Sequence, residues 1–200
     1  MNAIIPRFEF RAFAQNFGMA EEKIRKIAEF ERFRESSEIY ILSTANNHNN
    51  TKIRNNMMDI KRFVKEKRGL QQWEPKMKAE FPIKVNVICD EVFPAFGAAV
   101  PAFHRSEYTL AQFLEDIIKP RSDLALAYVF KRRYGYSVKG CQAEIADLLI
   151  NGAAIKTLAV ESVDVEAVLK VKATLGLEEY ENVNYILAIK RIIGMETLPE

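Results

Sequence analysis

The stretch of sequence that most constrains the fold runs from Tyr128 to Ser162. It contains three runs in which charged or polar residues alternate with apolar ones, separated by Gly140-Cys141 and Asn151-Gly152. Because successive side chains leave a β-strand on opposite faces, the alternation predicts three antiparallel strands that form a meander. Each strand would then have one apolar face that needs a cover and one polar face.

The polar faces of this meander carry ionisable groups of both signs. Lys131 and Arg133 share a face of the first strand, and Glu144 and Glu161 take the polar faces of the next two. Divalent metal ions prefer carboxylate oxygens, and phosphate prefers arginine and lysine donors. These faces are therefore compatible with a site for a metal and a phosphate chain, and equally with a solvated sheet surface.

Five other segments show the same alternation, which brings the number of predicted strands to eight. Asn55-Asn56 lies between two of them and predicts the tight turn of a hairpin. The charged residues between Lys65 and Pro75 are expected to form a connection. The five segments are residues 7–13, 36–43, 52–54, 59–61 and 76–81.

Helices are predicted wherever apolar residues recur at three- and four-residue steps. Thr109 and Asp164 are placed to cap two of them, and Gly176 to end one. Residues 85–103 are expected to form a short helix and an ordered loop. The clearer helical segments are residues 20–34, 109–118, 165–175 and 181–193.

The apolar stripes of these helices must cover the apolar side of the sheet. The opposite side then either faces solvent or lines a closed barrel. An open sheet of this size would leave two exposed edges, and cations outnumber anions on the predicted polar faces, so we expect closure. The predicted fold is α+β: one domain spanning residues 1–200, an eight-stranded antiparallel β-barrel with helices packed on the outside, and a C-terminal helix at 181–193.

Composition narrows the classes of partner. The 200 residues include 29 basic and 27 acidic ones, so the near-neutral total argues against nonspecific binding to nucleic acid or a membrane surface. Cys89 and Cys141 lack the spacing of a zinc site. The N-terminal segment does not have the pattern of a signal peptide, and we expect a cytoplasmic protein.

The order of charged pairs resembles the CYTH, or triphosphate tunnel metalloenzyme, superfamily across residues 6–176. This resemblance implies a barrel whose tunnel binds a triphosphate group through basic side chains, while carboxylates hold Mg²⁺ or Mn²⁺. The metal ligands that it implies are Glu9, Glu144 and Glu161. The triphosphate ligands that it implies are Arg11, Lys52, Arg54, Lys61, Lys78, Lys131 and Arg133.

Two positions depart from the pattern of the superfamily. Arg7 stands where the first carboxylate of a Glu-x-Glu-x-Lys strand belongs, and Ala159 replaces one of two glutamates near the end. Three hypotheses follow: a metal-dependent triphosphatase or phosphotransferase, a noncatalytic barrel that binds a nucleotide or polyphosphate with Arg7 supplying charge, and a scaffold held by salt bridges. In the first two, the partner is a small phosphorylated ligand. No catalytic residue is predicted.

Overall fold

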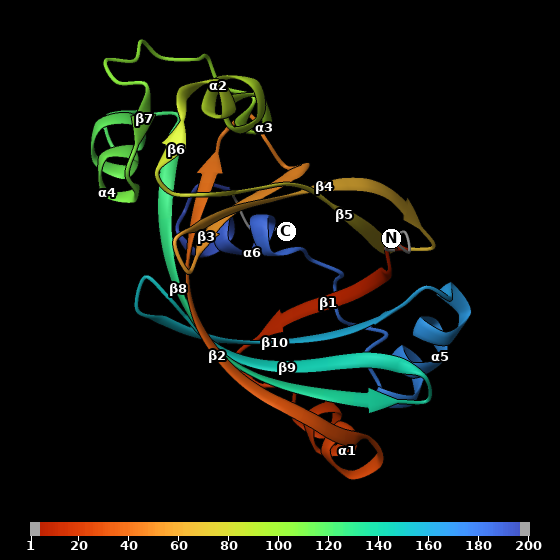
Figure 1. Cartoon of the computed structure of the whole chain (residues 1–200). Helices are drawn as coiled ribbons and strands as arrows, with labels where there is room; N and C mark the ends of the chain where they lie inside the picture. The colour runs from red at the N-terminus through yellow and green to blue at the C-terminus, as the bar shows by residue number, and fades with distance from the viewer. Residues whose placement is uncertain (1–4, 197–200) are drawn as a thin grey trace.

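The computed structural model describes residues 5–196, and a closed barrel of antiparallel strands forms its centre (Figure 1). The strands follow one another around the barrel in the order β1-β10-β9-β8-β2-β3-β4-β5, and β5 pairs back onto β1. The predicted α+β fold with an eight-stranded barrel is confirmed. The strands are β1 (Phe8–Ala14), β2 (Glu29–Ser43), β3 (Asn49–Arg54), β4 (Met57–Lys67), β5 (Leu70–Glu80), β8 (Leu124–Val138), β9 (Cys141–Ile150) and β10 (Ala153–Ser162).

Tight turns set the register of the hairpins. Asn55 and Asn56 both have positive φ angles, 52° and 58°, as a two-residue turn that matches the twist of the flanking strands requires. Asn151 and Gly152 do the same between β9 and β10. The predicted meander of three strands and the predicted hairpin at Asn55-Asn56 are both present.

Two predicted segments differ from the structure. Helix α1 (Met19–Ile27) ends earlier than expected, and β2 begins at Glu29, because Phe30 and Phe33 pair with tyrosines of β8. Residues 65–75, expected as a connection, instead form the far halves of β4 and β5. In the first place, pairing with a distant strand overrides a local pattern that favours helix. In the second, the positive φ angles of Arg68 and Gly69 turn the chain back, so that residues close in sequence pair as a hairpin.

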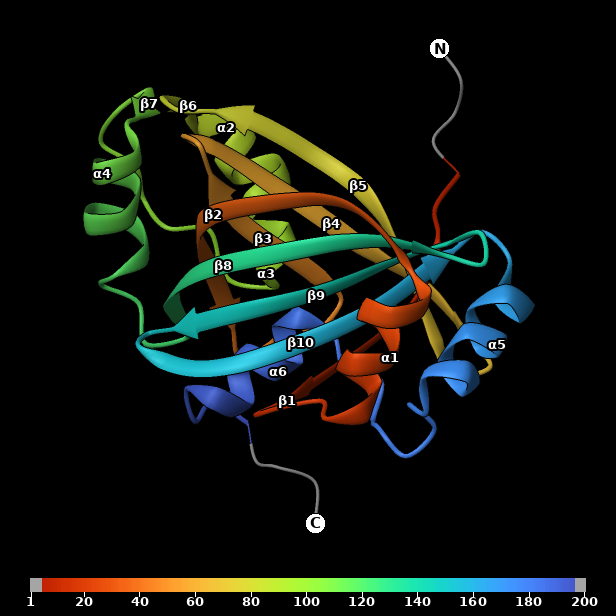
Figure 2. The same ribbon diagram turned by 90° about the horizontal axis from the view of Figure 1, so that it is seen from below.

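Two groups of helices cover the outer face of the barrel, near opposite ends of it (Figure 2). Helices α1 and α5 (Val165–Leu175) share an apolar cluster with β1, β8, β9 and β10. The other group shares a cluster with β2, β3 and β4. It consists of β6 (Ile83–Lys84), α2 (Val85–Val87), η1 (Ile88–Val92), α3 (Phe93–Phe96), β7 (Glu107–Tyr108), α4 (Leu110–Gln112) and η2 (Phe113–Ile118). None of the helices within residues 5–196 has the length and apolar character needed to cross a bilayer.

Helix α6 (Tyr185–Ile192) takes a different position. Its residues Ile186 and Ile189 are buried in a cluster with Tyr40 and Leu42 of β2, and with residues of β8 and β9. Tyr40 lines the barrel cavity, and Leu42, two residues further along β2, points to the same face of the strand. This cluster therefore lies on the inner side of the barrel. Figure 1 shows α6 within the ring of strands. The helix therefore fills part of the interior and leaves the remainder as a cavity.

Candidate anion-binding site

The unfilled part of the barrel interior is a cavity of about 190 Å³. Its wall brings together eight of the ten residues predicted as ligands: Glu9, Arg11, Lys52, Lys61, Lys131, Arg133, Glu144 and Glu161. The other two do not line it. Arg54 lies beside the cavity and bonds to Glu38, whereas Lys78 is exposed on β5.

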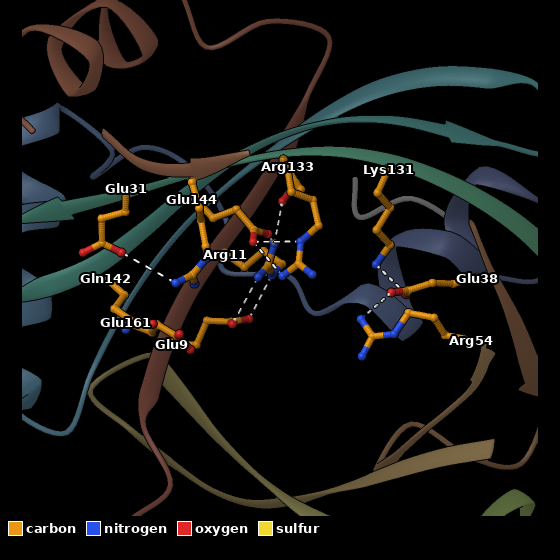
Figure 3. A network of polar contacts seen from close by, with 12 residues as sticks. Glu9, Arg11, Glu31, Glu38, Arg54, Lys131, Arg133, Gln142, Glu144 and Glu161 are labelled. Carbon is orange, nitrogen blue, oxygen red and sulfur yellow. Dashed lines mark hydrogen bonds and ion pairs between the residues drawn. The ribbon is translucent and has the colours of Figure 1, made fainter. Parts of the chain in front are cut away.

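Arginines and glutamates of β1, β8 and β9 form the first group of charges on the wall (Figure 3). The Nε of Arg11 lies 2.9 Å from one oxygen of Glu9, and its Nη1 lies 3.6 Å from Glu144. Arg133 reaches Glu144 with Nη2, at 2.6 Å. Burial alone would raise the pKa of Glu144, but Arg11 and Arg133 together hold it below its usual value.

Arg7, the residue immediately before β1, completes this group. Its Nη1 lies 3.0 Å from an oxygen of Glu161 and donates to the side-chain oxygen of Gln142 at 2.7 Å. We call the whole group the arginine–glutamate cluster, and it contains three cations and three carboxylates. Its members are Arg7, Glu9, Arg11, Arg133, Glu144 and Glu161.

This pairing does not fit a divalent metal site. Each of the implied metal ligands, Glu9, Glu144 and Glu161, is bonded to an arginine. Within residues 5–196, histidine, cysteine, aspartate and glutamate side chains do not gather in any group of three or more that could hold a metal ion. Arg7 places a positive charge beside Glu161, where the resemblance implies a carboxylate.

The second group surrounds the carboxylate of Glu38, whose side chain is fully buried. Lys131 lies 2.9 Å from it, and Lys52 and Arg54 each lie 3.3 Å from it. The hydroxyl of Tyr40 donates to it at 3.1 Å. We call Glu38, Lys52, Arg54 and Lys131 the lysine cluster. Burial would raise the pKa of Glu38, but the three cations hold it far below its ordinary value.

Lys131 is the most deeply buried cation of the lysine cluster. Its Nζ donates to the hydroxyl of Tyr40 at 2.8 Å and lies 3.6 Å from the ring centre of Tyr185 on α6. Burial lowers the pKa of Lys131 to about 7, even though Glu38 opposes that change. The ammonium therefore changes its charge near neutral pH.

Several residues of the cavity wall, and Glu38 behind it, were not predicted as ligands from the sequence. Arg32 lay inside a segment assigned to a helix, so its side-chain direction could not be assigned. Glu38 and Tyr40 lie two residues apart on the predicted strand, so both side chains fall on its polar face. That alternation was the sequence signal that could have placed them in the site. Tyr185 carried no local signal, because its role depends on where α6 packs. Trp73 also lines the cavity.

The chain forms a closed eight-stranded antiparallel barrel with a charged interior, and solved structures share this architecture. No protein-family model and no curated protein sequence matches the chain. Among solved structures, a Hippeastrum protein described as a candidate adenylyl cyclase with dominant triphosphatase activity is similar, with a TM-score of 0.55 and 11% identity over 96% of this chain and 98% of that one.

Two other structures share the fold at a TM-score of 0.51. A conserved hypothetical protein of Pyrococcus furiosus is 17% identical, over 89% of this chain and 98% of its own. A candidate adenylate cyclase of Bacillus halodurans is 10% identical, over 92% of this chain and 97% of its own. These similarities confirm the CYTH-like fold expected from the sequence.

Proposed function

We propose that the barrel interior binds a triphosphate-containing anion through the lysine-rich part of its wall. The observation that carries this proposal is the uneven distribution of charge. The arginine–glutamate cluster is balanced, whereas the lysine cluster sets three cations against the carboxylate of Glu38, and the buried Asp59 opposite Lys52 adds one more negative charge. Lys61 faces the same cavity and has no ion pair within residues 5–196. This excess of positive charge favours a multiply charged anion.

The size of the cavity supports a phosphate chain as the bound part. Its volume of about 190 Å³ is below the range of roughly 300–1,000 Å³ that is usual for pockets that enclose a drug-sized ligand. A nucleoside attached to the phosphates would therefore lie outside the cavity. The triphosphatase activity described for the Hippeastrum protein of similar fold agrees with this class of ligand.

Of the hypotheses raised by the sequence, the noncatalytic barrel is the one that the pairing of charges favours. Glu9, Glu144 and Glu161 are held by arginines, so they are not free to bind a metal ion. Arg7 contributes a fixed positive charge in this region. We therefore propose binding that does not require a divalent metal.

The test is a titration with tripolyphosphate in the presence of EDTA. Trp73 is the single tryptophan and lines the cavity, so its fluorescence should change saturably, with a stoichiometry of one in calorimetry. Absence of binding would contradict the proposed function. Hydrolysis of tripolyphosphate or ATP that depends on added Mg²⁺ or Mn²⁺ would contradict the noncatalytic form of it.

The affinity for anions should depend on pH through Lys131. Below the pKa of about 7 its ammonium is charged and attracts an anion, and above that pKa the charge is lost. Sulfate keeps a constant charge in this range, so its affinity should fall by about tenfold as the pH rises through neutrality, which corresponds to the loss of one favourable charge. Calorimetry across this range measures the effect. Lys131→Met should flatten the profile, and an equally steep profile in that variant would exclude Lys131 as the cause.

A further inference from the structure

The carboxylate of Glu38 occupies a site built for an anion. Four donors converge on it: the ammonium groups of Lys131 and Lys52, the guanidinium of Arg54 and the hydroxyl of Tyr40. Phosphate oxygens use the same kinds of donor as carboxylate oxygens do. Glu38 therefore makes, within the protein, the contacts that a phosphate group would make.

The position of Glu38 relative to the cavity determines what it can do. Lys52, Lys131 and Tyr40 line the cavity, whereas the side chain of Glu38 lies behind them with no exposed surface. A ligand in the cavity meets these donors while Glu38 already holds them. It must compete for the same hydrogens, and it is also repelled by a fixed negative charge a few ångströms further away.

We propose that Glu38 is a specificity-determining residue that acts as an internal counter-anion. It lowers the affinity for anions that carry little charge, such as sulfate or a single phosphate, and leaves the site selective for a triphosphate. A triphosphate has further oxygens that can reach Lys61 and Arg133, so it binds despite the competition. This inference rests on the proposed function and adds a basis for its selectivity.

The test compares sulfate with tripolyphosphate in Glu38→Gln over a series of acidic pH values, because Glu38 raises the pKa of Lys131 and its removal lowers that pKa further. The glutamine removes the negative charge and keeps the shape of the side chain. At the pH values at which Lys131 of the variant is charged, sulfate affinity should rise by at least about tenfold, because a negative unit charge close to the ligand is removed. Tripolyphosphate affinity should rise less, so the ratio of tripolyphosphate affinity to sulfate affinity should decrease. A loss of structure alone would weaken binding of both anions.

Glu38→Asp guards against a glutamine variant that does not fold. It keeps the charge but withdraws it by one methylene, so sulfate affinity should rise in the same direction by a smaller factor. Glu35→Gln is the matched control, because Glu35 lies on the same strand and bonds to Arg132 on the outer face of the barrel at 2.9 Å. Its ratio of affinities should equal that of the unchanged protein.

The outcomes separate this inference from the function on which it rests. If the unchanged protein does not bind tripolyphosphate, the proposed function is wrong. If it does bind, and neither Glu38 variant binds sulfate more tightly, the role of Glu38 as a counter-anion is wrong while the function stands. The inference is supported if sulfate affinity is highest in Glu38→Gln, intermediate in Glu38→Asp and lowest in the unchanged protein.

Discussion

Replacing Lys52 and Lys61 together by glutamine should weaken tripolyphosphate binding by more than about 100-fold. Each lysine can offer the phosphate chain a charge-assisted hydrogen bond, typically about 1.5–3 kcal/mol, and every 1.4 kcal/mol or so is a factor of ten. The fold should survive, because Glu38 keeps Lys131 and Arg54 as partners and Lys61 is exposed. Calorimetry or the fluorescence of Trp73 measures the loss.

Lys78→Gln is the matched comparison for this double variant. The sequence places Lys78 among the ligands, whereas the structure places its side chain in solvent away from the cavity wall. We expect its affinity for tripolyphosphate to match that of the unchanged protein. An equal loss in Lys78→Gln would show that the ligand extends beyond the cavity, and an unchanged affinity in the double variant would remove the lysines from the site.

Arg11→Met should lower the free energy of unfolding by about 3–5 kcal/mol, the usual consequence of removing one partner of a buried ion pair. The Arg11 side chain is 8% exposed and pairs with both Glu9 and Glu144, so its loss leaves Glu9 without its cation and Glu144 with Arg133 alone. Its guanidinium also lies 4.6 Å from the ring centre of Tyr185. Denaturant unfolding monitored by circular dichroism measures the change.

Arg7→Met provides the control for that experiment. Arg7 and Glu161 form the same kind of pair, but their side chains are 43% and 33% exposed. Loss of this pair should therefore lower the free energy of unfolding by less than about 1 kcal/mol. Adding Glu9→Gln to Arg11→Met should recover part of the lost free energy of unfolding, because the carboxylate that lost its cation is removed. A similar cost for Arg7 and Arg11 would mean that burial does not set the strength of these pairs.

The strands of the barrel could be predicted because their signal is local. Alternation alone placed Lys131 and Arg133 on one face and Glu9 and Arg11 on another, and all four line the same cavity. The turns at Asn55-Asn56 and Asn151-Gly152 were also predictable, since asparagine and glycine tolerate the positive φ angles that such turns require.

The parts that could not be predicted depend on contacts between distant segments. The first half of β2 has a pattern compatible with a helix, and only its pairing with β8 makes it a strand. Likewise, no local pattern shows that α6 enters the barrel or that Tyr185 meets Lys131. The pairing of each glutamate with a particular arginine is also a property of the assembled interior, so the poor fit to a metal site emerged only from the structure.

The position of α6 has a consequence for polymeric ligands. The apolar side chains of α6 pack against inner residues of β2, β8 and β9, so we expect the helix to block the passage of an extended polyphosphate through the barrel. Only a terminus would be held, and it would leave by the route through which it entered. Polyphosphates of different length should therefore bind with the same affinity when their concentrations are expressed as molar concentrations of chain ends.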